Sequence, residues 1–379
     1  MLSVAAVLAA CSSFKGAAGA QGDAAAASDG APASDTGAPL DAASGLDSGG
    51  ASDASAGVDA APGQDAAPGQ DAAPGQDAAP GQDAGAPDSS GACSGSGCPI
   101  EVVADNLSQA TLVLVDANNV YFGDEGSAAG TVYQCAKGGC AAPTTLGPGY
   151  ATGLGTDGTN VYWNDFAGGV VVSCAIGGCA NLPTIIAPAQ TQAEGVTFDG
   201  VNLYWATQGS IVTCRPPGCA ARATLATGQG GNIVHLASQS GVAYWMTSGG
   251  GGAAESCPAA GCGQTPAALV ASLGGSIVVK NGFAYFTNGN AVVSCPVSGC
   301  TTPHTLGSSS DPYGLGTDGT DIFWLDDVDQ VVYRCPITGC GGGASHFADM
   351  QLSQPGANVA LDGEYVYWTV PAQVLRRHK

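Results

Sequence analysis

Fourteen of the fifteen cysteines form seven pairs with four residues between the two partners. As thiolates they could bind a metal, but zinc takes four Cys or His ligands. Residues 93–379 hold only four histidines, His235, His304, His346 and His378. Residues that face each other across antiparallel strands have Cα atoms roughly 4.5–5.5 Å apart, which a disulfide can span. We therefore expect seven local structural disulfides. The pairs are Cys93–Cys98, Cys135–Cys140, Cys174–Cys179, Cys214–Cys219, Cys257–Cys262, Cys295–Cys300 and Cys335–Cys340.

The fifteenth cysteine, Cys11, has no partner at this spacing, and an odd cysteine needs an explanation. Leu8-Ala9-Ala10-Cys11 resembles the bacterial lipobox. That resemblance implies cleavage before Cys11 and lipidation of this residue. The apolar run before it is too short to span a bilayer as a helix and lacks the usual basic start. We expect residues 1–11 to be a lipoprotein signal peptide whose true start lies upstream, with Cys11 as the acylated first mature residue. By the same resemblance, Ser12 implies sorting to the outer membrane.

Residues 12–92 form a segment of different composition, rich in Ala, Gly, Pro, Ser, Gln and Asp. Eleven of its aspartates recur every six residues, from Asp23 to Asp83. Pro and Gly oppose helix, and so few large apolar side chains cannot offset the entropy of ordering. A calcium site is a weak alternative, because one carboxylate per six flexible residues does not build a cage of oxygens. The composition predicts a disordered stalk whose ends lie roughly 50 Å apart.

Residues 93–379 repeat an aromatic pair seven times, at spacings of 38 to 44 residues. The pairs are Tyr121-Phe122, Tyr162-Trp163, Tyr204-Trp205, Tyr244-Trp245, Tyr285-Phe286, Phe323-Trp324 and Tyr367-Trp368. Within one repeat, residues 153–187, four short β-forming runs are separated by Gly-containing turns. Four strands every 40 to 45 residues are typical of a β-propeller blade.

The order of the motifs predicts how the ring closes. Each of the first six aromatic pairs precedes a cysteine pair, whereas Tyr367-Trp368 is followed only by the chain end. The first cysteine pair, Cys93/Cys98, has no aromatic pair before it. We therefore expect an all-β, seven-bladed propeller of four-stranded blades, closed by both chain ends, with residues 99–104 as the outermost strand of the shared blade. Six or eight blades remain alternatives.

The aromatic repeat resembles the YWTD propeller of low-density lipoprotein receptors. It reads YWND at 162–165, YFGD at 121–124 and FWLD at 323–326. The resemblance implies an extracellular, ligand-binding propeller without enzymatic activity. That family usually has six blades, so the seven repeats and the regular cysteine pairs depart from it.

Several polar residues could do chemistry, but each has a structural interpretation. Five aspartates precede the first aromatic of a repeat by five residues, where Gln239 and Lys280 stand in the other two repeats. They are Asp116, Asp157, Asp199, Asp318 and Asp362. A calcium-binding ring is conceivable, but Asp is favoured in such turns. Asp326, Asp327 and Asp329 could bind calcium but lack the EF-hand pattern, and we expect a solvated loop. The aromatic pairs are expected to pack in the core.

Two further features complete the candidates. His235 is the one histidine expected on an inner strand, where it is either catalytic or a satisfied core residue. Arg376, Arg377 and Lys379 form a basic tip that could pair with nearby acids.

The sequence contains no G-x-S-x-G, H-E-x-x-H, P-loop or C-x-x-C motif. The net charge of −22 argues against nucleic acid as a partner, because phosphate contacts need basic patches. We expect no catalytic residues, no cofactor and no bound metal. The sequence favours a monomeric lipoprotein, lipid-anchored in the bacterial envelope at the outer membrane, whose propeller binds a protein or glycan. The alternatives are a propeller hydrolase or lyase with a central metal, or a passive envelope component.

Overall fold

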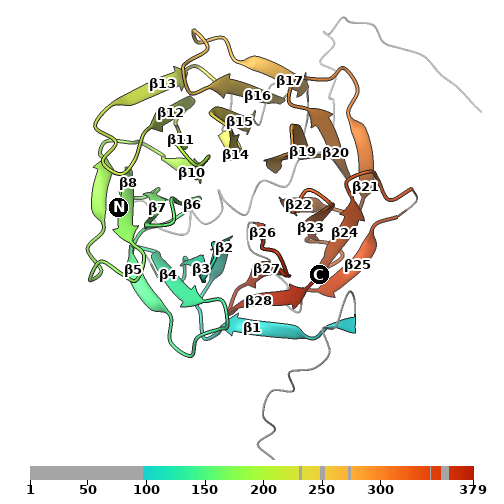
Figure 1. Ribbon diagram of the computed structural model, residues 1–379, viewed down its shortest axis with the longest axis horizontal. Coiled ribbons are helices and arrows are strands. Elements are labelled where there is room, and N and C mark those ends of the chain that lie inside the picture. The colour runs from blue at the N-terminus through green and yellow to red at the C-terminus, as the bar shows by residue number, and fades with distance from the viewer. Residues whose placement is uncertain are drawn as a thin grey trace, which may run out of the picture. The chain divides into compact units, whose positions relative to one another are not determined.

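The computed structural model describes residues 97–127, 129–229, 233–247, 252–271, 275–341, 343–350 and 358–379. These residues form seven four-stranded sheets, which stand as blades around a ring (Figure 1). The expected all-β, seven-bladed propeller is confirmed, and the alternatives of six and eight blades are wrong. Within the described ranges, no helix is long and apolar enough to cross a membrane. The signal peptide, Cys11, the stalk and Cys93 lie outside the described residues.

Each blade runs from an innermost strand A to an outermost strand D. Blade 1 contains β2 (Ala110–Val115), β3 (Asn119–Asp124), β4 (Thr131–Ala136) and β5 (Thr144–Pro148). Blade 2 contains β6 (Leu154–Thr156), β7 (Asn160–Asp165), β8 (Val170–Ala175) and β9 (Thr184–Ala187). Blade 3 contains β10 (Glu194–Phe198), β11 (Leu203–Thr207), β12 (Ser210–Cys214) and β13 (Arg222–Ala226). Blade 4 contains β14 (Ile233–Gln239), β15 (Val242–Thr247), β16 (Ala253–Pro258) and β17 (Ala267–Ala271).

The remaining three blades complete the ring. Blade 5 contains β18 (Ile277–Lys280), β19 (Phe283–Asn288), β20 (Ala291–Pro296) and β21 (His304–Ser308). Blade 6 contains β22 (Pro312–Thr317), β23 (Asp321–Asp326), β24 (Val331–Pro336) and β25 (Ser345–Asp349). Blade 7 contains β26 (Val359–Leu361), β27 (Tyr365–Val370), β28 (Gln373–His378) and, as its strand D, β1 (Ile100–Ala104).

Blade 7 joins the two ends of the described chain, as the order of the motifs predicted. Strand β1 pairs antiparallel with β28, with Ile100 opposite Arg377 and Val102 opposite Leu375. Figure 1 shows β1 lying along the outer side of β28. The closure covers a strand edge that would otherwise offer unpaired backbone groups to another chain.

The core lies between blades, and the aromatic pairs build it. Consecutive strand residues point to opposite faces of a sheet. Each Tyr-Trp pair therefore sends one ring toward each neighbouring blade. Tyr121 packs in one cluster with Trp163 of blade 2, and Tyr162 packs with Trp205 of blade 3. The same arrangement recurs at all seven seams between blades, ending with Tyr367 against Phe122. The expected core role of the aromatic pairs is confirmed.

The last residues of the chain fasten blade 7 to its neighbours. Arg376 Nε donates to Glu101 on β1 at 2.8 Å, and its guanidinium lies 4.2 Å from the ring centre of Tyr365. Lys379 Nζ pairs with Asp318 of blade 6 at 2.7 Å. Lys137 of blade 1 pairs with Asp362 of blade 7 at 2.8 Å. Of the three residues of the basic tip, Arg376 and Lys379 thus pair with acids.

We predict that Trp205→Ala lowers the free energy of unfolding by about 3–5 kcal/mol, because Trp205 is fully buried in the seam between blades 2 and 3. Urea denaturation followed by circular dichroism measures this. Phe283→Ala is the matched control, since Phe283 is 43% exposed and its removal leaves no internal cavity. Equal losses in the two variants would contradict a core built at the seams.

Candidate functional site

The propeller has two faces that differ in construction. Neighbouring strands in each blade are antiparallel, so the A–B and C–D connections meet at one end of the blade and the B–C and D–A connections at the other. We call the first end the AB/CD face. It is made by the AB turns (116–118, 157–159, 199–202, 240–241, 281–282, 318–320 and 362–364) and by the C–D loops that carry the cysteine pairs.

The BC/DA face is the opposite end of every blade. Its BC turns are 125–130, 166–169, 208–209, 248–252, 289–290, 327–330 and 371–372. Its DA loops are 105–109, 149–153, 188–193, 227–232, 272–276, 309–311 and 350–358. Some residues of these connections lie outside the described ranges.

The repeated aspartates build the AB turns. Asp157 Oδ1 accepts hydrogen bonds from the N–H groups of Thr159 and Asn160, at 2.8 and 2.6 Å. Its Oδ2 accepts from the hydroxyl of Tyr162 at 2.6 Å. Asp116, Asp199 and Asp362 repeat both contacts in their own blades. The spacing of five residues thus places the Asp carboxylate within hydrogen-bond distance of the Tyr hydroxyl. The expectation that these aspartates build turns is confirmed.

Where the aromatic lacks a hydroxyl, the aspartate has another partner. Blade 6 has Phe323 in place of Tyr, and there Lys379 Nζ reaches Asp318. Asp362 receives both the Tyr367 hydroxyl and the Lys137 ammonium. Burial opposes ionisation of Asp362, but the Lys137 contact and the backbone donors outweigh it and lower its pKa to about 2. These carboxylates are occupied by structural contacts.

The structure contains six of the seven expected disulfides, with Cα–Cα distances from 5.1 to 5.8 Å. Cys98 is also disulfide-bonded, and its expected partner Cys93 lies outside the described residues. Each observed bridge closes a C–D loop on the AB/CD face.

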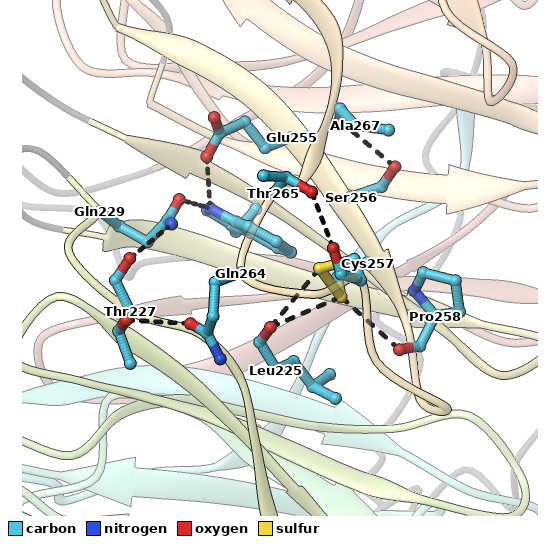
Figure 2. The surroundings of a disulfide bond; sticks show 12 residues. Leu225, Thr227, Gln229, Glu255, Ser256, Cys257, Pro258, Gln264, Thr265 and Ala267 are labelled. Carbon is cyan, nitrogen blue, oxygen red and sulfur yellow. Dashed lines mark hydrogen bonds between the residues drawn. A yellow bond between two sulfur atoms is a disulfide. The ribbon is translucent and has the colours of Figure 1, made fainter.

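The disulfide loops also contact the preceding blade. The N–H groups of Cys140, Cys300 and Cys340 donate to Val103, Leu269 and Leu306 on the outer strands of the blades before them, at 3.0, 3.1 and 2.8 Å. A disulfide sulfur carries no proton, so its approach to these carbonyls is a contact rather than a hydrogen bond. Figure 2 shows the Cys257 bridge beside the Leu225 carbonyl, which lies 3.4 Å from Cys262 Sγ.

Two arginines make the corresponding contact at other seams. Arg222 Nη1 donates to the Ile186 carbonyl at 3.2 Å, between blades 3 and 2. Blade 7 has no cysteine on β28, and there the buried Arg377 donates through Nη1 to the Phe347 carbonyl of blade 6. Sequence reasoning missed this role of Arg377.

On the BC/DA face, three aspartates that end B strands hold the loops. Asp124 accepts from the N–H groups of Ser108 and Gln109, at 3.0 and 2.7 Å. Asp326 accepts from those of Asp311, Val328 and Asp329 at 2.7 to 3.0 Å. Asp165 bonds Tyr150 and Gly168 in the same way. Each carboxylate therefore joins a DA loop to a BC turn.

The acidic cluster at 326–329 is a hydrogen-bonded turn. Asp329 accepts from the hydroxyls of Ser310 and Tyr333 at 2.8 and 3.0 Å, and Asp327 accepts from the Gln330 amide at 3.2 Å. In the described part of the chain, no group of three or more His, Cys, Asp or Glu side chains is arranged to hold a metal ion. The expected solvated loop is wrong for Asp326, which ends β23 and is fully buried because its carboxylate accepts backbone hydrogen bonds there. Asp329 is exposed in the turn that follows.

Titratable residues on the innermost strands are Glu194, His235, Lys280 and Tyr313. Glu194 and His235 lie on neighbouring strands. His235 is on β14, as expected, and burial lowers its pKa to about 4. Glu194 begins the neighbouring strand β10, and burial raises its pKa to about 7. Among the described residues, no hydrogen bond or ion pair joins the two. Sequence reasoning missed Glu194, because its environment depends on the packing of adjacent blades.

A pocket of about 380 Å³ lies on the outer part of blade 6. Its lining includes Asp321, Arg334, His346 and Phe347. Arg334 is paired with Asp321 at 2.6 Å, and His346 contacts Asp349 at 2.8 Å. The charged groups of this pocket are therefore paired with each other.

Comparisons with known proteins place the chain by fold. No protein-family model matches the sequence, and no curated protein matches it. Among solved structures, an inactive histidine-to-alanine variant of virginiamycin B lyase from Staphylococcus aureus, with quinupristin, is similar at a TM-score of 0.59 and 14% identity, covering 74% of this chain and 98% of that one. YCF48 bound to a D1 peptide is similar at a TM-score of 0.56 and 11% identity, covering 74% and 94%.

A chain of the nidogen/laminin complex is similar at 20% identity, with a TM-score of 0.40 and coverage of 52% of this chain and 76% of that one. The likeness to the lyase and to YCF48, at these identities, shows a shared fold alone. The chain is a seven-bladed propeller by its own sheets.

We predict that Cys295→Ala/Cys300→Ala lowers the free energy of unfolding by about 2 kcal/mol, because a closed loop of this size removes modest entropy from the unfolded chain. Denaturation under oxidising conditions measures the change. Under reducing conditions the same variant and the wild-type protein should have similar stabilities. A difference that persists after reduction would contradict stabilisation by this bridge.

We predict that Glu194 makes stability fall as the pH rises from about 5 to 8. Its pKa in the folded protein is raised to about 7 by burial, so the folded state holds the proton that the unfolded state releases at lower pH. Stability from this group is therefore present below pH 4.5 and lost through pH 7. Glu194→Gln should remove this component when urea denaturation is compared across the range. An unchanged pH profile would contradict the shifted pKa.

Proposed function

We propose that the propeller is a scaffold that binds a protein or glycan partner through its BC/DA face. The observation that carries this proposal is the contrast between the two faces. AB turns are two to four residues long and C–D loops seven or eight, whereas BC turns vary from two to six and DA loops from three to nine. Variable loops on a rigid ring are the usual setting for recognition.

The structural contacts of the AB/CD face support this assignment. Its aspartates, disulfides and arginines hold turns and seams together, so changes there cost stability. On the BC/DA face, residues such as Val328, 63% exposed at the tip of a BC turn, can vary without loss of the fold. YCF48, whose fold is similar, is seen with a bound D1 peptide, and a peptide-binding role here is consistent with that use of the ring.

The proposal includes the cellular location of the scaffold. The lipobox resemblance at Cys11 and the Asp-rich segment 12–92 support a lipid anchor and a stalk that hold the propeller at the bacterial envelope, at the outer membrane by the identity of Ser12. We propose that the molecule acts as a monomer in this position.

The alternative function is a lyase or hydrolase reaction at the centre of the ring. It is favoured by Glu194 and His235, which lie on neighbouring innermost strands with pKa values shifted by burial. A carboxyl group that titrates near neutrality can serve as a general acid or base. Under this alternative Glu194→Gln would abolish turnover, whereas partner binding at the outer loops would be unchanged.

The scaffold function is tested by capture. The full chain with Cys11→Ser, oxidised and immobilised, is incubated with envelope extract, and bound proteins and glycans are identified by mass spectrometry. We expect a saturable partner. Capture should fall at least tenfold when BC turn 125–130 is replaced by the two-residue turn 289–290 of blade 5, because both connect strands B and C.

Glu364→Thr is the matched control, since it changes the sequence of AB turn 362–364 to that of 157–159 and leaves the BC/DA face intact. Capture by this control should equal that of the wild-type chain. Equal capture by all three proteins, or no saturable capture, would overturn a partner site on the BC/DA face.

A further inference from the structure

Charge in residues 97–379 is segregated between the two faces. Assigning each side chain to the loop that contains it, or to the nearer end of its strand, places all eight Lys and Arg residues in the AB/CD half. These are Lys137, Arg215, Arg222, Lys280, Arg334, Arg376, Arg377 and Lys379. Eight acidic residues share that half, so its formal charge is zero. The undescribed residues after Gly97 include no charged side chain.

The BC/DA half holds the other eleven acidic residues and no Lys or Arg, for a formal charge of −11. They are Asp105, Asp124, Glu125, Asp165, Glu194, Glu255, Asp311, Asp326, Asp327, Asp329 and Asp349. They come from blades 1, 2, 3, 4 and 6 and from the DA loops 105–109 and 309–311. The segregation is therefore a property of the whole face rather than of one cluster.

Six of the eight cations of the AB/CD half are occupied by contacts within the described residues. Four of them are in ion pairs with Glu101, Asp318, Asp321 and Asp362. Arg222 and Arg377 donate to backbone carbonyls across seams. Since these cations lie on the other face, no Lys or Arg side chain balances the negative formal charge of the BC/DA half. Asp349 of this half contacts His346 at 2.8 Å.

Two further features of the BC/DA face point to a polypeptide partner. Val328 stands exposed between Asp327 and Asp329 on blade 6. On blade 2 the half-buried Phe166 has its ring 6.4 Å from that of the buried Tyr150. The face thus offers apolar contacts beside carboxylates. Glu125 and Glu194 are also partly withdrawn from water, which raises the pKa of both, and an approaching cation would favour their charged forms.

The chain's own linker does not supply the missing charge. Residues 12–92 contain twelve Asp and one Lys, so the linker carries −11. Like charges repel over about 8 Å at physiological ionic strength, which disfavours docking of this segment on the BC/DA face.

We propose that the BC/DA face docks a cationic segment of a partner protein, in which Lys or Arg side chains meet the loop carboxylates and apolar residues contact the tip of blade 6. This proposal rests on the proposed scaffold function and names its partner class. Charge complementarity of this kind mainly raises the association rate and selects the partner, so binding should weaken steeply with salt.

The probe for the test is an octalysine peptide that carries a fluorophore and a photo-crosslinker. The protein is the full chain with Cys11→Ser, and binding is measured by fluorescence anisotropy at low and physiological salt. One variant combines Asp105→Asn, Asp327→Asn and Asp349→Asn on the face. The matched control combines Asp65→Asn, Asp71→Asn and Asp77→Asn in the linker, which changes the net charge by the same amount.

We expect crosslinks on the BC/DA loops, a Kd increased on the order of tenfold by the face variant, and less than about a twofold change in the linker control. Circular dichroism and thermal melting confirm that the face variant is folded. Crosslinks confined to the linker or the AB/CD face, equal weakening by both variants, or no saturable binding would overturn the proposal.

The two proposals fail in distinguishable ways. Loop-dependent capture from envelope extract without octalysine binding would overturn only the cationic partner and leave the scaffold function in place. Octalysine binding on the BC/DA loops without any captured partner would overturn the scaffold function while the cation-binding face itself is retained.

Discussion

The alternation of an aromatic pair across each B strand is the constraint on which the structure depends. Because neighbouring strand residues point to opposite sides of the sheet, Tyr204 packs toward blade 4 and Trp205 toward blade 2. A single blade cannot bury both rings, so each blade is stable only between two others. A row of such blades would expose one aromatic surface at each end. Joining β1 to β28 removes both ends, and it lets Tyr367 and Phe122 form the last seam.

Closing the ring requires that each blade packs on the next in one fixed position. The contacts that fix this position lie on the AB/CD face. The carboxylate of an AB turn receives the Tyr hydroxyl at 2.6 to 2.8 Å, which positions the aromatic that faces the next blade. The disulfide loops, and Arg377 on β28 of blade 7, contact the outer strand of the preceding blade. On the opposite face, the carboxylates of Asp124, Asp165 and Asp326 hold the DA loops by accepting hydrogen bonds from backbone N–H groups. The remaining BC/DA residues are therefore free to differ between blades.

The fold could be predicted because it repeats. A period near 41 residues, alternating β-forming runs and the order of aromatic and cysteine motifs were sufficient to predict blade number, strand order and closure. The turn role of Asp157 was also predictable from its Gly neighbour, although its bond to Tyr162 was not recognised from the five-residue spacing. The shifted pKa of Glu194 was not predictable, since it depends on how β10 packs between other blades. The role of Arg377 became visible only once β28 was known to end beside blade 6. Lipidation of Cys11 and disorder of residues 12–92 stay predictions.

The charge segregation follows from the same asymmetry between the faces. Several cations form ion pairs that join neighbouring blades, such as Lys137 with Asp362 and Lys379 with Asp318. Residues 97–379 contain eight Lys and Arg residues, and all of them lie in the AB/CD half. The BC/DA half therefore contains none. A surface that only kept the protein soluble could spread its carboxylates over both ends. Here five of the eleven acids of the BC/DA half lie in the loops of variable length, and the other six lie on strands. The five loop acids are Asp105, Glu125, Asp311, Asp327 and Asp329. The linker 12–92 carries the same sign of charge, so the proposed partner of this face is a cationic segment of another protein.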